Sequence, residues 1–316
     1  MLYRSFGEIL EKVRSGGPVT ISVAVAQDRD VLEAVKAAEE AGIARAILVG
    51  DENLINPLRE KVGLSPDTAV IHEPETNKAA LRAVSLVKKG EAQVLMKGLI
   101  NSSDFLKAVL HATEGLRTRR LLSHLAVFEV PGEEKLVFHT DGGINIAPNL
   151  GEKKDILVNA MLALNAIGIT NPYVALLTAN EMVNPKMPAT VDAKALVEMS
   201  EQGELPPGVV EGPIALDVAV SPLAAKHKGI VSRVSGKVDL FLVPNIETGN
   251  ALGKSLIYYA KAKMAGLVLG ATHPVVMTSR AETAEGKLNS IALACCLGNL
   301  LTNGRGTTDA QSRGIE

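Results

Sequence analysis

Thr278, Ser279 and Arg280 place two hydroxyls and a guanidinium between a short apolar strand and a predicted helix. The first turn of a helix offers backbone N–H groups without intrahelical partners and the positive end of the helix dipole. With the planar fork of an arginine, these groups suit an anion such as phosphate. The alternative is a helix cap, with Glu282 and Glu285 as acidic first-turn residues. Both interpretations stay open on the local sequence.

A second candidate anion site follows the predicted strand 94–96. Lys97 and Gly98 come directly after it, and Ser102 and Ser103 begin the next predicted helix. A lysine, a glycine that lets the backbone approach a ligand and two hydroxyls at a helix start are the parts of a phosphate-binding loop. Alternatively, Ser102 or Ser103 only caps the helix.

Two further loops carry polar residues after predicted strands. His139 and Asp141 follow one strand; we interpret the histidine as structural and the aspartate as a turn residue or a carboxylate near a thiol or an amide. Gly249 lies where the strand 240–243 leads into a predicted helix, and Lys254 lies one turn into that helix. Gly253, Lys254 and Ser255 match the end of a P-loop, but the leading glycine falls one residue late, which argues against a nucleotide triphosphatase. A lysine one turn into a helix still suits an anion.

The elements that must position these loops alternate between strands and helices through the first third of the chain. After a first helix at 2–13, the pattern predicts strands at 19–26, 46–49, 69–71 and 94–96, and helices at 30–41, 52–62, 75–89 and 103–110. Four such βα repeats with short connections favour a parallel sheet with helices on both faces. Ligands bind at the carboxyl ends of strands in such sheets, which is where the polar loops lie.

The pattern changes near residue 121. Two apolar segments, 122–129 and 135–140, flank Pro131 and Gly132 and predict a β-hairpin at the start of a second subdomain. Further on we predict helices at 152–167, 189–201, 215–227, 248–264 and 281–300, and strands at 173–177, 240–243 and 267–269.

Composition limits the class of protein. The 316 residues allow two α/β domains, and the formal net charge of −2 gives no reason to expect nucleic acid or an anionic membrane as partner. Adjacent Cys295 and Cys296 in an apolar helix indicate a core pair in a reducing compartment. We find no signal peptide or membrane span and expect a cytoplasmic protein. No metal-ligand spacing, dinucleotide fingerprint or serine-hydrolase elbow is present.

Several segments together resemble the phosphate acetyl/butyryltransferase family, and the butyryltransferase branch more than the acetyltransferase branch. The resemblance covers essentially the whole chain and rests on order and spacing rather than on any one motif. Its segments are Lys97-Gly98, NPKMP at 184–188, EGPIALD at 211–217, HKG at 227–229, VPNIETGN at 243–250 and TSR at 278–280.

The resemblance implies a reversible reaction, acyl-CoA plus inorganic phosphate giving acyl phosphate plus CoA. Coenzyme A would be a substrate, and no permanently bound cofactor or metal is expected. The implied fold has two α/β domains with mostly parallel sheets around a cleft, as in isocitrate and isopropylmalate dehydrogenases, and the implied assembly is a homodimer. We place domain one at 1–120 plus 274–316 and domain two at 121–273.

The resemblance also implies roles for single residues. Arg280 and Ser279 would stabilise the transition state, and a carboxylate shortly after them would act as base. Acetyltransferase relatives carry an aspartate where this chain has Gly286, so Glu285 is the nearest substitute, with Glu282 behind it. The substrate-binding residues expected are Lys97, Gly98, Ser102, Ser103, Asp141, Gly249, Asn250, Lys254 and Thr278.

Three alternatives accompany this reading. The first is a phosphate acetyltransferase within the same family. The second is an NAD-linked decarboxylating dehydrogenase of the same fold, and the third is a non-catalytic protein that binds CoA or another metabolite.

Overall fold

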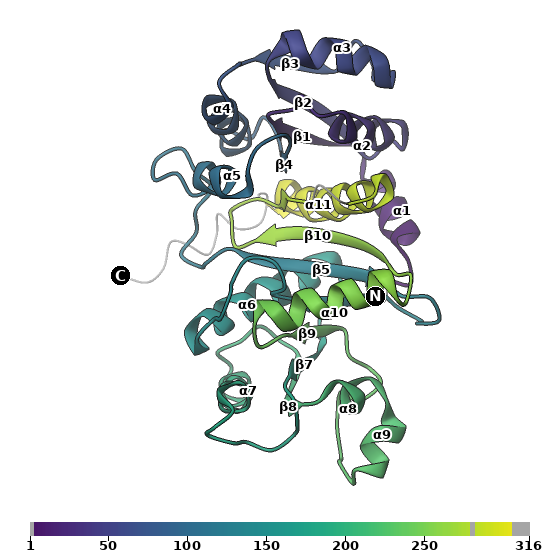
Figure 1. The fold of residues 1–316 in the computed structure, drawn as a ribbon, viewed down its shortest axis with the longest axis vertical. Helices are drawn as coiled ribbons and strands as arrows, with labels where there is room; N and C mark the ends of the chain where they lie inside the picture. Colours follow the sequence, from purple (N-terminus) through teal and green to yellow (C-terminus); the bar gives the residue numbers. More distant parts are fainter. Residues whose placement is uncertain (1–2, 279–281, 305–316) are drawn as a thin grey trace. The chain divides into compact units, whose positions relative to one another are not determined.

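The computed structural model describes residues 3–278 and 282–304, which fall into two compact units (Figure 1). We call them the N-terminal unit and the central unit. The first comprises Phe6–Thr118 and Ala265–Glu316, and the second Met1–Ser5 and Arg119–Met264. The domain boundaries expected from the sequence stay a prediction.

The N-terminal unit alternates strands and helices, as its hydrophobic pattern predicts. Its elements are α1 (Phe6–Gly16), β1 (Val19–Ala24), α2 (Arg29–Glu40), β2 (Ala44–Gly50), α3 (Glu52–Val62), β3 (Ala69–His72), α4 (Thr76–Lys88), β4 (Val94–Lys97), α5 (Ser102–Val109), β10 (Lys263–Leu269), β11 (Val275–Val276) and α11 (Ala284–Gly304). The cap of α2 is Asp28, whose carboxylate accepts from the amide of Val31 at 3.0 Å.

The strands of the N-terminal unit lie in the order β3-β2-β1-β4-β11-β10. β1 pairs in parallel with β2 and β4, and β4 pairs in parallel with β11, whereas β10 runs antiparallel to β11. The aliphatic side chains of β1 are buried, as expected for a strand covered on both faces by helices. The predicted α/β class with a mostly parallel sheet is confirmed.

The sheet changes its direction of growth at β1. From β1 the chain moves outward to β2 and β3, and α4 then returns it to β4 on the other side of β1. Since parallel crossovers are right-handed, helices on the two sides of this reversal cover opposite faces. Figure 1 shows α4 and α5 on one side of these strands and α2 and α11 on the other. The carboxyl ends of β1 and β4 therefore form a switch point, where open α/β sheets bind ligands.

The central unit begins with the predicted hairpin. Its elements are β5 (Ser123–Glu129), β6 (Val137–Thr140), α6 (Leu150–Ile167), β7 (Tyr173–Leu177), α7 (Pro188–Glu201), β8 (Val209–Ile214), α8 (Leu216–Val220), α9 (Pro222–His227), β9 (Leu240–Leu242) and α10 (Ile246–Tyr258). The strand order is β5-β6-β9-β7-β8, with β5 and β6 antiparallel and the remaining neighbours parallel.

Three predictions for the central unit were wrong. Strand β8 was missed because Gly212 and Pro213 discourage a strand assignment, but β8 lies at the edge of the sheet, where proline is tolerated. The helix predicted at 215–227 is two helices, because the hydroxyl of Ser221 caps α9 and Pro222 is its first residue. The helix predicted at 248–264 ends at Tyr258, and Lys261 then takes a left-handed conformation with φ of 59°.

Helix α11 contains the predicted core pair of cysteines. Cys295 and Cys296 are both buried, which confirms their predicted place in the core, whereas the reducing compartment stays a prediction. Burial raises the pKa of the Cys295 thiol above its ordinary value, and the neighbouring Cys296 adds to the shift. No helix in the described ranges is long and apolar enough to cross a bilayer.

His139 is a buried residue of β6, the strand between β5 and β9. Its ring contacts Phe128 edge-to-face at a centroid distance of 4.8 Å, and its buried Nδ1 has no hydrogen-bond partner among the described residues. Burial, with a smaller contribution from His124, lowers the pKa of His139 to about 3. The imidazole is therefore neutral at physiological pH, and the structural interpretation of His139 fits its surroundings.

This histidine predicts a loss of stability in mild acid. In the unfolded chain the pKa returns to roughly 6.5, so the unfolded state binds the extra proton first. The contribution to stability is complete above that value and is lost as pH falls toward about 3, by up to about 1.4 kcal/mol per pH unit. We expect His139→Gln to flatten the pH dependence of the urea midpoint between about pH 6 and pH 4. The same change at exposed His227 should leave the curve as in the wild type; coincident curves for all three proteins would contradict the prediction.

Candidate functional site

Three connections of the N-terminal unit start at the same edge of its sheet. Ala24 of β1 lies opposite Lys97 of β4, and Met96 of β4 lies opposite Val276 of β11. Because the three strands are parallel, the residues that follow each of them emerge side by side. The register thus brings Lys97, Gly98 and Thr278 to one edge, at the switch point between β1 and β4.

Gly98 is required by the backbone that it contacts. Its amide donates to the carbonyl oxygen of Ala24 at 2.8 Å, and the amide of Leu99 donates to that of Val25 at 2.7 Å. A Cβ atom at position 98 would lie 2.3 Å from the Val25 oxygen, so any side chain would clash. Val25 itself has a φ of 58°, which is strained for a β-branched residue. The packing against β1 explains this glycine without a ligand.

Lys97 is the last residue of β4 and is buried. Its Nζ donates to the carbonyl oxygen of Gly98 at 3.3 Å, which keeps the ammonium close to the edge of the sheet. A buried ammonium attracts anions more strongly than one in bulk water, because the surrounding dielectric is lower.

The serines after Gly98 do not cap α5. The cap position belongs to Asn101, and Ser102 and Ser103 are the first two residues of the helix. Both serines are exposed, and within the described ranges their hydroxyls form no hydrogen bond. The capping interpretation is therefore wrong, whereas the phosphate-binding interpretation stays a prediction.

The connection from β11 to α11 begins with Thr278, which is half-buried. Ser279 and Arg280 lie outside the described residues. The cap of α11 is Thr283, whose Oγ1 accepts from the amide of Gly286 at 3.0 Å, so α11 starts later than predicted and Thr278 is not its cap. Glu285 is the second residue of the helix and is exposed.

Lys287 is a residue of this connection that the sequence reading overlooked. It is buried in the first turn of α11, and its Nζ donates to the carbonyl oxygen of Glu282 at 2.9 Å and to a carboxylate oxygen of Asp30 at 3.5 Å. A lysine at the positive end of a helix is electrostatically unfavourable unless it has partners. The unfavourable position of this lysine at the start of a predicted helix could have drawn attention to Lys287. The contact joins the start of α11 to the first turn of α2, which follows β1.

The central unit has its own polar loop at the end of β6, organised by Asp141. Its buried carboxylate accepts from the amides of Gly143 at 2.8 Å, Ile144 at 2.9 Å and His124 at 3.1 Å. Asn145 adds its backbone amide at 3.3 Å and its side-chain amide at 2.6 Å. These bonds hold the loop in one conformation, and a direct role of Asp141 in substrate binding stays a prediction.

The helix after β9 packs on this loop. β6 and β9 are parallel neighbours, so their carboxyl ends share an edge. A Cβ on Gly249 would lie 2.6 Å from the Cα of Gly142, which shows how closely the two backbones approach. Asn250 and Lys254 follow on the exposed surface of α10, one turn apart. Lys254 forms no ion pair with any described residue, so its charge is available to an anion.

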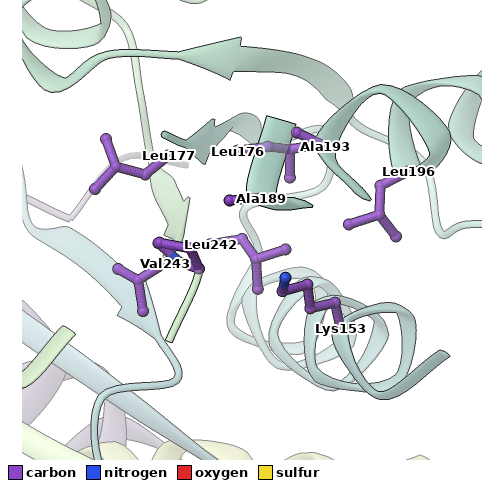
Figure 2. A pocket seen from close by; sticks show the side chains of 9 residues that line it. Lys153, Leu176, Leu177, Ala189, Ala193, Leu196, Leu242 and Val243 are labelled. Atoms are coloured by element: carbon purple, nitrogen blue, oxygen red, sulfur yellow. The ribbon is translucent and has the colours of Figure 1, made fainter. Parts of the chain in front are cut away.

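A small cavity lies in the central unit at the carboxyl ends of β7 and β9, with residues of both α6 and α7 in its wall (Figure 2). Its walls are apolar apart from Lys153, whose Nζ contacts Asp192 at 2.6 Å. The volume of about 10 Å³ is room for roughly one water molecule. None of the predicted binding residues lines it. The described residues also contain no group of three or more His, Cys, Asp or Glu side chains suited to a metal ion.

The loop around Asp141 generates a prediction about stability. Asp141→Asn replaces one acceptor oxygen with a donor that faces other donors, and we expect a loss of about 2–4 kcal/mol in the free energy of unfolding, because buried N–H groups lose their acceptor. Urea titration of the exposed counterpart Asp67→Asn should stay within about 0.5 kcal/mol of the wild type. Equal midpoints for the two variants would show that the carboxylate does not hold the loop.

Comparison with known proteins gives the same family for sequence and structure. Residues 5–82 and 77–295 match the family model described as "Phosphate acetyl/butaryl transferase". A phosphate butyryltransferase from Clostridium acetobutylicum is 49% identical over 93% of this chain and 98% of its own length. A phosphate acetyltransferase from Rhizobium meliloti is 39% identical, with 92% of both chains covered.

Among solved structures, a branched-chain phosphotransacylase from Enterococcus faecalis V583 has a TM-score of 0.78 and 34% identity. The match covers 89% of this chain and 99% of that one. Because the family model, the relatives and this structure each span nearly the whole chain, it belongs to the phosphate acetyl/butyryl transferase family.

Proposed function

We propose that the protein is a phosphate acyltransferase that moves a short-chain acyl group reversibly between coenzyme A and inorganic phosphate, most closely a phosphate butyryltransferase. The observation that carries the proposal is the 49% identity with a phosphate butyryltransferase over 93% of the chain. The acetyltransferase alternative rests on a relative of lower identity, 39%.

The chemistry requires anion binding and charge stabilisation. When the CoA thiol attacks an acyl phosphate, negative charge develops on the carbonyl oxygen and on the departing phosphate. Arg280 and Ser279 are the groups that we propose for this stabilisation. Lys97 and the exposed hydroxyls of Ser102 and Ser103 belong to the same unit and suit the phosphate, because they combine a positive charge with donors at a helix start.

The substrate-binding residues that we propose also include residues of the central unit. Lys254 offers a charge that no described residue neutralises, and Asn250 lies one turn before it on the exposed side of α10. Gly249 and Asp141 act on the shape of the loops that carry these side chains. CoA is a substrate in this proposal, and a cytoplasmic homodimer with a dehydrogenase-like arrangement of two domains remains part of it.

The direct test is phosphate-dependent release of CoA from acyl-CoA thioesters. We expect purified protein to release free thiol from butyryl-CoA and branched short-chain acyl-CoA when phosphate or arsenate is present, and not without them. A higher kcat/KM for acetyl-CoA would favour the acetyltransferase alternative. No release from acetyl-, propionyl-, butyryl- or branched acyl-CoA would overturn the proposal, and binding of CoA without turnover would favour the non-catalytic alternative. Reduction of NAD with hydroxy acids would favour the dehydrogenase.

Arg280 provides the sharpest single variant. We expect Arg280→Ala to lower kcat by about 10²–10³-fold, since removal of one donor to a developing oxyanion typically has this effect. Arg82→Ala, an exposed arginine of α4, is the matched control and should keep the wild-type kcat. An unchanged kcat in Arg280→Ala would remove this residue from the mechanism.

A further inference from the structure

The carboxylate of Glu282 lies against Gly286, at the start of α11. A Cβ atom at position 286 would be 2.2 Å from Oε1 of Glu282 and 2.8 Å from its Cδ. Any side chain at 286 would therefore displace the carboxylate from its present place. The glycine and the glutamate form one arrangement, in which the missing side chain of one makes room for the carboxylate of the other.

Neighbouring residues hold Glu282 in this position. The amide of Thr283 donates to its Oε1 at 3.3 Å, and the buried ammonium of Lys287 donates to its backbone oxygen at 2.9 Å. Lys287 also contacts Asp30, in the first turn of α2. The ammonium thus links the backbone of Glu282 to the start of the helix that follows β1.

The surroundings of Glu282 suit a base. The residue is half-buried, so its carboxylate is partly removed from water and still reachable. Burial raises the pKa of this carboxyl above its ordinary value, against smaller opposing effects of the Thr283 amide and Lys287. A carboxylate with a raised pKa accepts a proton more readily near neutral pH. Glu285, three residues on, is exposed.

We propose that Glu282, rather than Glu285, is the carboxylate that exchanges the proton of the CoA thiol. The inference rests on the proposed acyltransferase function and names the residue that the sequence alone left between two glutamates.

In the direction of acyl-CoA formation, Glu282 accepts the thiol proton while sulfur bonds to the carbonyl carbon of the acyl phosphate, and the carbonyl electron pair moves onto oxygen. Collapse of this tetrahedral adduct breaks the bond between carbon and the phosphate oxygen, and the electron pair leaves with phosphate. Glu282 then returns the proton to the departing phosphate, and no atom changes its oxidation state.

Two single variants test the assignment. We expect Glu282→Gln to lower kcat by about 10²–10⁴-fold, the usual contribution of a general base, with KM values within about threefold of the wild type. Glu285→Gln should lower kcat by a smaller factor. Glu60→Gln, an exposed glutamate of α3, is the matched control and should keep the wild-type kcat. A larger loss in Glu285→Gln, or a wild-type kcat in Glu282→Gln, would overturn the inference.

A third variant tests the arrangement itself. Gly286 is a helical residue, so Gly286→Ala should fold and keep or raise the thermal midpoint, while it displaces the Glu282 carboxylate. We expect Gly286→Ala alone to lower kcat by at least about tenfold. In the Glu282→Gln background the same change should lower kcat no further, because both changes remove the same interaction. Additive losses would contradict the proposal.

The activity of the wild-type protein in the same assay distinguishes a failure of the proposed function from a failure of the Glu282 assignment. Without phosphate-dependent release of CoA by the wild type, the proposed function itself fails. An active wild type with an equally active Glu282→Gln refutes only the assignment of the base.

Discussion

Two backbone hydrogen bonds between the end of β1 and the residues after β4 hold the candidate site of the N-terminal unit together. They join Ala24 and Val25 to Gly98 and Leu99, and they need a glycine at 98 and a strained conformation at Val25. Strain of this kind persists only where surrounding contacts fix the backbone, and it concentrates at functional sites. These two hydrogen bonds fix the backbone at Gly98 and Leu99. They therefore also set the direction of Lys97, which comes before them, and the start of α5, which comes after them.

The two units use buried polar groups differently. In the central unit, the carboxylate of Asp141 accepts hydrogen bonds from amides of the protein itself, and these bonds shape a loop. In the N-terminal unit, the candidate polar side chains are less completely engaged: the hydroxyls of Ser102 and Ser103 are exposed, and the side-chain carboxylate of Glu282 accepts one hydrogen bond among the described residues, from the amide of Thr283. Groups with spare donors and acceptors are the ones that chemistry on a substrate requires.

The sequence predicted the elements of the N-terminal unit well, because β1 to β4 are apolar runs separated by amphipathic helices with ordinary caps. It failed where a tertiary contact overrode a local pattern. Strand β8 contains a glycine that packs on Leu176 and a proline that only an edge strand accepts. A missed local cap explains another difference: α11 starts at Ala284 rather than at 281, because the hydroxyl of Thr283 makes the capping bond.

The sequence predicted which residues lie at the candidate site better than it predicted what each of them does. Spacing after strands was enough to place Lys97, Gly98 and Thr278 at one edge, since register follows from parallel pairing. Spacing could not tell that Gly98 is needed for packing, or that Glu282 rather than Glu285 lies against Gly286. Both facts depend on distances between particular atoms, which the periodicity of the sequence does not give.

The adjacent cysteines of α11 have a practical meaning for enzymology. Both are enclosed by the core, and the thiol of Cys295 resists ionisation at neutral pH because its pKa is raised. Since aromatic disulfide reagents react with thiolates that they can reach, the native polypeptide contributes almost no colour to such an assay. A colorimetric trace recorded under native conditions then counts liberated coenzyme alone, and a late rise in absorbance marks unfolding of the protein.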